Sequence, residues 1–301
     1  MAPRYETITF LSDYGRTDEF VGVVHSVIRS IAPEVAVIDL THDIPPYDVR
    51  AGGLALARAT PYLCPGVVVA VVDPQVGTSR RPIAVEVGDG ASVLVGPDNG
   101  VLAPAVALCG GATRAVHIAE PEYLLPGEAT TFDGRDVFAP AAAHLCLGVD
   151  LAELGPAIDP VSLFPAMVPL PREEDGRLHA EVLWVDRYGN AQLNVDPDEL
   201  APFDDDVRLV MADGARSARR VAAFAELDRN ELGLITDAYG LVAVVLDRRS
   251  AAQELGLSSG SEVTIEILDE QGRPGTTTPV NLGPRPVDLG PRPVDLGTRQ
   301  Q

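Results

Sequence analysis

An aspartate and an arginine lie seven residues apart in one short loop of this 301-residue chain. Asp73 directly follows the apolar run 67–72, and Arg80 comes near the end of a stretch of Pro, Gly and small polar residues. Opposite charges across such a tight loop can hold one small polar molecule between them, and burial or a neighbouring charge shifts the pKa of such a carboxyl group. A plain structural ion pair is the alternative explanation.

Two loops nearer the start of the chain carry side chains of a similar chemical type. Asp13 and Asp18 follow the apolar run 7–11. An aspartate at the end of a strand can accept both hydroxyls of a ribose, and it is also a common helix N-cap. Tyr47 lies in the loop 41–48 and offers an aromatic ring beside the same edge of the predicted sheet.

Later loops add another carboxylate and a group of three side chains of different chemical types. Asp133 lies in the stretch 130–140, at the head of a helical pattern. In the second half of the chain, a strand-like run ends in a carboxylate, an aromatic ring and a carboxamide: Asp186, Tyr188 and Asn190. The loop 96–100 is equally well explained as a plain turn, because Pro, Asp, Asn and Gly each favour turns for local reasons.

The basic residues limit the classes of enzyme to which the chain can belong. All 23 are arginines, so the chain has no lysine. Pyridoxal-phosphate and other Schiff-base enzymes, and P-loops of the G-x-x-x-x-G-K-[ST] type, all need a lysine amine, and these classes are excluded. The 44 acidic residues give a formal net charge of −21. Such an excess argues against nucleic acid or an anionic membrane surface as a partner.

Compartment and metal content follow from other patterns. No apolar run reaches the length of about 18 residues that a bilayer span requires, and the first residues lack a signal-peptide profile, so we expect a cytoplasmic protein. The five histidines show no metal-ligand spacing, and the three cysteines lie in apolar stretches, which predicts buried thiols. We therefore expect neither a metal nor a cofactor.

The elements that must position these loops alternate in type over the first half of the chain. Apolar residues recur at helical spacing over 20–31, and short β-branched runs predict six strands: 7–11, 35–40, 67–72, 83–87, 92–95 and 115–118. This alternation predicts an α/β layered domain with a mostly parallel sheet, spanning residues 1–160. In such sheets the ligand site lies at the carboxyl ends of the strands, where the loops above begin.

The second half has a different organisation. The Pro-rich segment 161–177 is expected to be a linker. Strand-like runs dominate residues 178–272, which predicts a smaller C-terminal β-barrel domain. Residues 273–301 contain Gly-Pro-Arg-Pro-Val-Asp-Leu twice and have little apolar periodicity, so we expect a disordered tail.

Two stretches are specific enough to suggest a family. Residues 73–81 read D-P-x-V-G-T-x-R-R, and residues 132–140 read F-x-G-R-D-x-F-A-P. With the other loops they resemble the S-adenosylmethionine (SAM) hydroxide adenosyltransferases, or SAM hydrolases, which are related to the SAM-dependent fluorinase and chlorinase. The resemblance covers residues 6–268. It implies an N-terminal α/β domain, a C-terminal β-barrel, and a homotrimer that binds SAM between the first domain of one subunit and the barrel of the next.

The resemblance also implies roles in substrate binding. Asp13 matches the family's ribose-binding carboxylate, Asp18 a contact near the methionine end, and Tyr47 an aromatic residue that packs on the substrate. The barrel loop supplies matches to the adenine-binding aromatic and carboxamide and to a carboxylate near the methionine amine: Tyr188, Asn190 and Asp186. Ala238 replaces a serine that relatives carry near the methionine carboxylate, and the turn 247–250 replaces one that usually contains Asn.

One position of the catalytic group departs from the family. Asp73 and Arg80 match two members of an Asp-Arg-His triad that positions water, whereas Asp133 takes the place of the histidine. Two neighbouring carboxylates repel each other, which raises at least one pKa. Such a pair can share a proton and still bind a water, or it can leave the site slow.

The implied reaction is attack of water on C5′ of the ribose of SAM, which releases adenosine and methionine without a cofactor. In the fluorinase a tyrosine stands at the position of Asp73, so the hydroxide-type enzymes are the closer resemblance. Two alternatives stay open: transfer of a halide to the same carbon, and a non-catalytic protein that binds SAM or adenosine.

Overall fold

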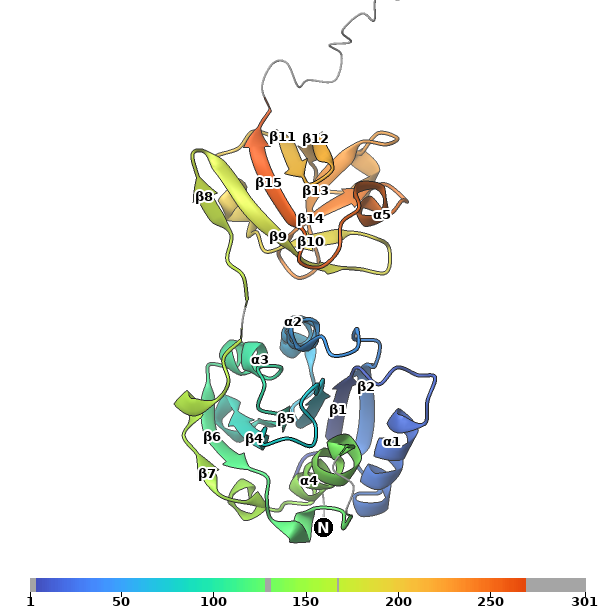
Figure 1. The fold of residues 1–301 in the computed structure, drawn as a ribbon, viewed down its shortest axis with the longest axis vertical. Coiled ribbons are helices and arrows are strands. Elements are labelled where there is room, and N and C mark those ends of the chain that lie inside the picture. The colour runs from blue at the N-terminus through green and yellow to red at the C-terminus, as the bar shows by residue number, and fades with distance from the viewer. Residues whose placement is uncertain (1–3, 128–130, 167, 269–301) are drawn as a thin grey trace, which may run out of the picture.

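A seven-stranded sheet forms the centre of the first domain in the computed structural model, which describes residues 4–127, 131–166 and 168–268 (Figure 1). In spatial order the strands are β2 (Ala36–Thr41), β1 (Thr7–Ser12), β3 (Val67–Val71), β5 (Ser92–Pro97), β4 (Pro82–Val87), β6 (Ala112–His117) and β7 (Ala157–Ile158). The first four pair in parallel, and β4 and β7 run against their neighbours. Five of the seven strands thus share one direction, which confirms the predicted mostly parallel α/β sheet.

Helices cover both faces of this sheet. Helix α1 (Phe20–Ile31) packs on α4 (Ala139–Cys146) over one face, and α2 (Val49–Ala59) packs beside α3 (Ala103–Leu108) over the other (Figure 1). Strand β3 lies between the two helical layers and is buried along its whole length, as its uninterrupted Val/Ala sequence predicts. The loops that leave β1, β2 and β3 therefore emerge side by side at one edge.

A closed β-barrel forms the second domain. Its strands are β9 (Arg177–Val185), β10 (Ala191–Leu193), β11 (Asp206–Met211), β12 (Gly214–Arg220), β13 (Leu232–Thr236), β14 (Val242–Leu246) and β15 (Glu262–Ile267). Strand β9 pairs with both β15 and β10, which closes the ring of seven strands around an apolar interior. Helix α5 (Ala251–Leu255) packs against β14. The predicted barrel is confirmed.

The segment between the domains contains one short strand. Strand β8 (Arg172–Glu174) lies within the predicted linker 161–177 and pairs with β9 outside the ring. The predicted domain limits stay predictions, and the predicted tail at 273–301 lies outside the described residues. One expectation about the cysteines is wrong. Cys146 is buried, whereas Cys64 is exposed, because it lies in the surface connection that leads into β3.

Candidate active site

Asp73, Arg80 and Asp133 meet in the structure. The Arg80 Nη2 donates to Asp73 Oδ2 and, over 2.6 Å, to Asp133 Oδ2, while Arg80 Nε donates to Asp73 Oδ1 over 3.2 Å. One guanidinium group therefore joins two carboxylates that lie 60 residues apart in the sequence. Bidentate pairing of this kind fixes the orientation of the Asp73 carboxylate as well as its position.

Local backbone structure explains how these three residues are held. Asp73 follows the buried end of β3, and a tight turn with Gly77 in the left-handed region (φ 79°) brings the chain back to Arg80, just before β4. Asp133 immediately precedes a π-helical turn, Gly134–Phe138, which leads into α4. Wide turns of this type occur often at functional sites because they redirect the side chains beside them.

The group is buried and carries excess negative charge. The side chains of Asp73 and Arg80 are only 5% and 3% exposed, and Arg80 Nη1 is buried without a hydrogen-bond partner. Burial raises the pKa of the Asp73 carboxyl group above its ordinary value; the Arg80 guanidinium opposes this effect, and the negative charge of Asp133 adds to it. The predicted repulsion thus acts on Asp73, although burial is the larger cause.

The loops after β1 and β2 meet beside this group. Asp13 Oδ2 accepts a hydrogen bond of 2.9 Å from the backbone N–H of Tyr47. Burial raises the pKa of Asp13, and the hydrogen bond from Tyr47 opposes that increase. Tyr47 has a left-handed backbone (φ 69°) and a side chain that is 73% exposed. The structure thus joins Asp13 and Tyr47, whereas Asp18 lies exposed just before α1 and makes no hydrogen bond or ion pair among the described residues.

Tyr14 also belongs to this site, although no pattern in the sequence distinguishes it from the rest of the loop that contains Asp13. Its hydroxyl oxygen lies directly against Gly134, so closely that a Cβ on that glycine would be 2.2 Å away. Its ring packs edge-on against Phe132, the residue before Asp133. Burial, together with the negative charges of Asp13, Asp73 and Asp133, raises the pKa of Tyr14, so its hydroxyl stays protonated.

The three residues predicted on the barrel form a group of their own. Asp186 Oδ1 accepts from the backbone N–H groups of Tyr188 and Asn190 at 2.8 and 2.9 Å, and Asp186 Oδ2 accepts from the Asn190 side chain at 2.8 Å. The Asp186 carboxylate therefore stabilises the conformation of its own loop, in which Tyr188 is 79% exposed. Within the described parts of the chain, no hydrogen bond or ion pair joins this loop to Asp13, Asp73 or Asp133.

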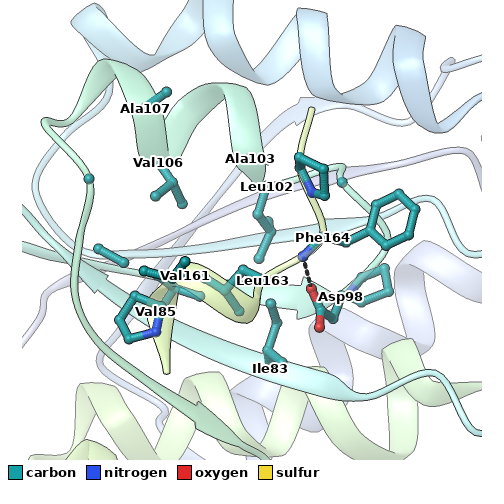
Figure 2. Close-up of a pocket in the computed structure, with 16 residues that line it drawn as sticks. Ile83, Val85, Asp98, Leu102, Ala103, Val106, Ala107, Val161, Leu163 and Phe164 are labelled. Carbon is teal, nitrogen blue, oxygen red and sulfur yellow. Dashed lines mark hydrogen bonds between the residues drawn. The ribbon is translucent and has the colours of Figure 1, made fainter. Parts of the chain in front are cut away.

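A second aspartate–arginine pair has a structural role. Arg81, the neighbour of Arg80, pairs with Asp98, whose other oxygen accepts from the Phe164 backbone N–H at 2.8 Å. Asp98 and Phe164 line one side of a cavity of about 310 Å³ beside α3 (Figure 2). Its lining is otherwise apolar, and Asp98, its one charged residue, is already bonded. The loop 96–100 is thus a structural turn, and this cavity contains none of the predicted site residues.

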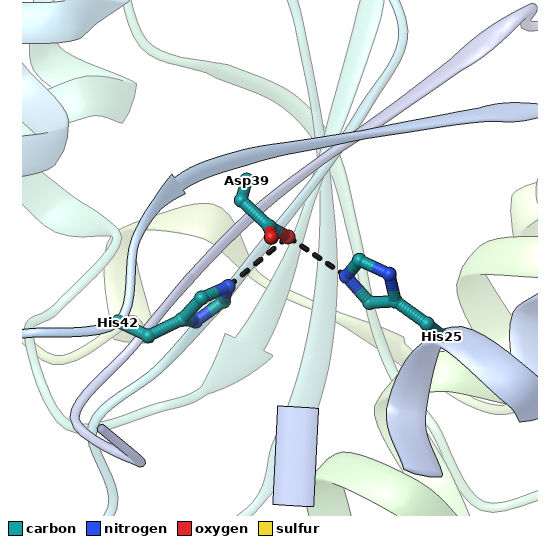
Figure 3. A group of neighbouring side chains, drawn as sticks. All are labelled: His25, Asp39 and His42. Atoms are coloured by element: carbon teal, nitrogen blue, oxygen red, sulfur yellow. Dashed lines mark hydrogen bonds and ion pairs between the residues drawn. The ribbon is translucent and has the colours of Figure 1, made fainter. Parts of the chain in front are cut away.

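Two histidines gather around one aspartate (Figure 3). His25 Nε2 and His42 Nε2 lie 2.7 and 3.0 Å from the same atom, Asp39 Oδ1. Among the described residues this is the one cluster of side chains of the types that bind a metal. Sequence spacing did not reveal it, because the three residues come from α1, from β2 and from the loop after β2.

The chain matches sequence profiles of one family over most of its length. The profile of the SAM hydroxide adenosyltransferase N-terminal domain matches residues 8–155, and that of the C-terminal domain matches residues 180–264. Among the described residues, no helix has the length and hydropathy that a membrane span requires.

Several individual proteins are similar to this chain. A Salinispora tropica protein named (R)-S-adenosyl-L-methionine hydrolase is 44% identical over 86% of this chain and 97% of its own length. A Thermus thermophilus protein of the same name is 40% identical over 86% and 98%. A fluorinase from Actinoplanes sp. is 23% identical over 86% and 96%. The crystal structure of a conserved protein from Thermotoga maritima superposes with a TM-score of 0.79 at 34% identity, covering 86% of this chain and 99% of that one.

Proposed function

Because the chain belongs to the SAM hydroxide adenosyltransferase family, we propose that it hydrolyses SAM to adenosine and L-methionine. The observation that carries the proposal is the buried bridge that Arg80 makes between Asp73 and Asp133, in a chain that is 40–44% identical to proteins named SAM hydrolases. Those names specify the R configuration at sulfur, so we propose the R epimer as the substrate.

The chemistry requires alignment of a water more than it requires a strong base. Water attacks C5′ of the ribose, the C5′–O bond forms as the C5′–S bond breaks, and the electron pair of that bond goes to sulfur. The positively charged sulfonium leaves as a neutral thioether, and the water loses one proton. Holding the water opposite sulfur in a desolvated site provides most of the rate enhancement.

The residues of the first domain divide this task among them. Asp73 accepts a hydrogen bond from the attacking water and takes its proton, and Arg80 keeps the carboxylate turned toward that water. Asp133 completes the pocket and accepts from the same guanidinium nitrogen, Arg80 Nη2, as Asp73. Asp13 accepts the ribose hydroxyls beside the exposed ring of Tyr47, and Asp18 lies near the methionine end. The net negative charge favours a cationic substrate. No metal or cofactor enters this mechanism.

We also propose a homotrimer in which the barrel of one subunit completes the site of the next. The separation of the barrel loop from Asp13 and Asp73 within one chain, together with the exposed rings of Tyr47 and Tyr188, supports this assembly. In it, Tyr188 and Asn190 bind adenine, and Asp186 lies near the methionine amine. The three free cysteines suit the reducing cytoplasm, where we propose that the enzyme acts.

The test is to incubate the purified protein with each SAM epimer and to identify products by liquid chromatography. We expect the R epimer to give adenosine and methionine in equal amounts, and we expect Asp73→Asn to form neither product. Asp98→Asn is the matched control, because it alters the neighbouring aspartate–arginine pair outside the site and should keep activity. A 5′-halo-adenosine that appears only with added chloride or fluoride would indicate a halide transferase instead. Binding of SAM without any product would indicate a non-catalytic protein.

A further inference from the structure

His42 links the histidine–aspartate cluster to the turn that carries Asp13 and Tyr14. On one side of its ring, Nε2 faces Asp39 Oδ1; on the other, Nδ1 lies 2.8 Å from Ser12 Oγ. The Ser12 hydroxyl oxygen in turn accepts from the Tyr14 backbone N–H over 3.3 Å. The backbone carbonyl of His42 accepts from the N–H of Gly15 over 2.8 Å. One residue thus contacts the turn 12–15 at both of its ends.

Burial makes the loss of any of these contacts costly. The side chains of Ser12 and His42 have no solvent exposure, so water cannot replace a lost partner. A buried polar group left unpaired costs more than the net gain from its hydrogen bond, so each proton in the chain of contacts has a preferred position. The rigid elements β1 and β2, which pair in parallel, hold Ser12 and Asp39 in place.

The arrangement of donors selects one tautomer of His42. Ser12 Oγ already accepts from Tyr14, and its own hydrogen needs an acceptor, which Nδ1 of His42 provides. The ring proton then lies on Nε2, where it faces the Asp39 carboxylate. Burial raises the pKa of Asp39, but the two histidine rings outweigh that effect and hold the pKa below its ordinary value, so Asp39 is ionised. It accepts a hydrogen bond from His25 Nε2, whereas His42 Nε2, 3.0 Å from the same oxygen, is too poorly aligned for one.

We propose that His42, held in one tautomer by Ser12 and facing Asp39, is a positioning residue that orients the turn 12–15 for substrate binding. This inference rests on the proposed function, because Asp13 is the ribose-binding residue on that turn. His42 contacts Ser12 and Gly15 on either side of Asp13, so a loss of its Nδ1 contact lets the Asp13 carboxylate swing away from the ribose. His25 supports the same arrangement from α1 through Asp39.

A bound metal ion is the competing explanation for this cluster. It would need a bare Nε2 on His42, so the ring proton would have to lie on Nδ1 and point at Ser12. The hydroxyl hydrogen of Ser12 would then lose its acceptor. The Arg16 guanidinium, 3.8 Å from Asp39 Oδ2, also places a positive charge beside the position that a cation would take. The hydrogen-bonded chain is the better account.

The tautomer is measured directly by ¹⁵N NMR of the full chain labelled at its five histidines. We expect His42 to carry its proton on Nε2 at neutral pH. In Asp39→Asn the amide oxygen can still face Nε2 and Ser12 still donates to Nδ1, so the proton should stay on Nε2. A wild-type His42 with a bare Nε2 overturns the proposal, and so does zinc or manganese that binds one ion per chain and is lost in His42→Asn.

Two matched variants separate the contacts of His42. Asparagine places its amide oxygen near the position of Nδ1 and preserves the link to Ser12, whereas glutamine reaches the position of Nε2 and preserves the link to Asp39. We expect His42→Asn to bind adenosine within about threefold of the wild type and His42→Gln to bind about tenfold more weakly, the size of one lost buried hydrogen bond. Calorimetry of adenosine binding measures both, and thermal melts confirm folding.

Equal adenosine affinity in both variants and the wild type would overturn the positioning role. In SAM turnover, the glutamine variant should raise KM more than it lowers kcat, because Asp73 and Arg80 are untouched. Adenosine binding and the tautomer need no turnover. A wild type that binds adenosine but leaves SAM intact therefore refutes the proposed function alone, and an active enzyme whose two variants bind alike refutes the positioning role alone.

Discussion

Gly134→Ala is the substitution whose effect on the site follows most directly from the structure. Gly134 lies between Asp133 and the rest of the π-helical turn, with the Tyr14 hydroxyl against its Cα. An added Cβ would lie 2.2 Å from the hydroxyl oxygen and 3.0 Å from the ring carbon that bears it. Because an unstrained contact needs about 3.5 Å, Tyr14 or the turn has to move by about 1.3 Å.

Such a movement displaces catalytic groups, since Asp133 precedes the glycine and Asp13 precedes the tyrosine. A misplacement of about 1 Å at a reacting centre can cost about 100-fold in rate. We therefore expect Gly134→Ala to lower kcat/KM by about 100-fold, or about 2.7 kcal/mol of transition-state stabilisation. Tyr14→Phe removes the closest atom, so in that background the same alanine should cost about tenfold less, a coupling that a double-mutant cycle measures.

The assay is the release of adenosine from SAM, with thermal melts to check that each variant folds. Gly22→Ala is the control: it lies on the exposed side of α1, and its added Cβ meets nothing within 4 Å. It should keep full activity. A folded Gly134→Ala protein with wild-type kcat/KM would refute the reasoning, because it would show that the contact between Tyr14 and Gly134 does not position the site.

Three further predictions follow from charged pairs. The pKa of Asp73 is raised, so activity should be lost as the pH falls through a value above the pKa of an ordinary aspartate. Asp133→Asn removes a negative neighbour and should move this acid limb of kcat/KM to lower pH. An unmoved limb would show that the charge of Asp133 does not act on Asp73. Asp133→His introduces the residue type that the family resemblance implies at this position and should keep or raise turnover. Loss of turnover in this variant would show that Asp133 is not a weakened substitute for histidine. Arg114 donates hydrogen bonds to Glu86 and holds the pKa of that carboxyl group below its usual range. Arg114→Ala should therefore lower the free energy of unfolding at neutral pH by about 1–2 kcal/mol. The difference from wild type should shrink as the pH falls through the lowered pKa of Glu86.

The parts of the site that sequence could predict are those formed by local chain geometry. Asp73 and Arg80 are seven residues apart in one Pro/Gly turn, and their pairing follows from that turn. Asp133 joined them only through the family resemblance, since nothing local brings residues 73 and 133 together. The apolar residues at helical spacing over 20–31 indicated a helix, and α1 spans these residues because that spacing is regular.

The parts that sequence missed depend on tertiary packing. The contact of His25 with Asp39 requires α1 to pack on the sheet beside β2, and that of His42 with Ser12 requires the pairing of β1 with β2. Strand β12 has an Arg/Ser-rich sequence without apolar alternation, so its sequence does not indicate a strand; it is held by pairing with β11 and β13. The position of Asp186 near the methionine amine stays a prediction; its bonds to the backbone of its own turn could not be read from the sequence.

The measurement that tests the central claim most directly is SAM turnover in water enriched in oxygen-18. If a water held by Asp73 and Arg80 attacks C5′, the heavy oxygen appears in the 5′-hydroxyl of the released adenosine, one atom per molecule, with an equal amount of methionine. Asp73→Asn should lose this product, and Asp98→Asn should keep it. Adenosine without the label, methylthioadenosine as the only product, or no turnover would contradict the account.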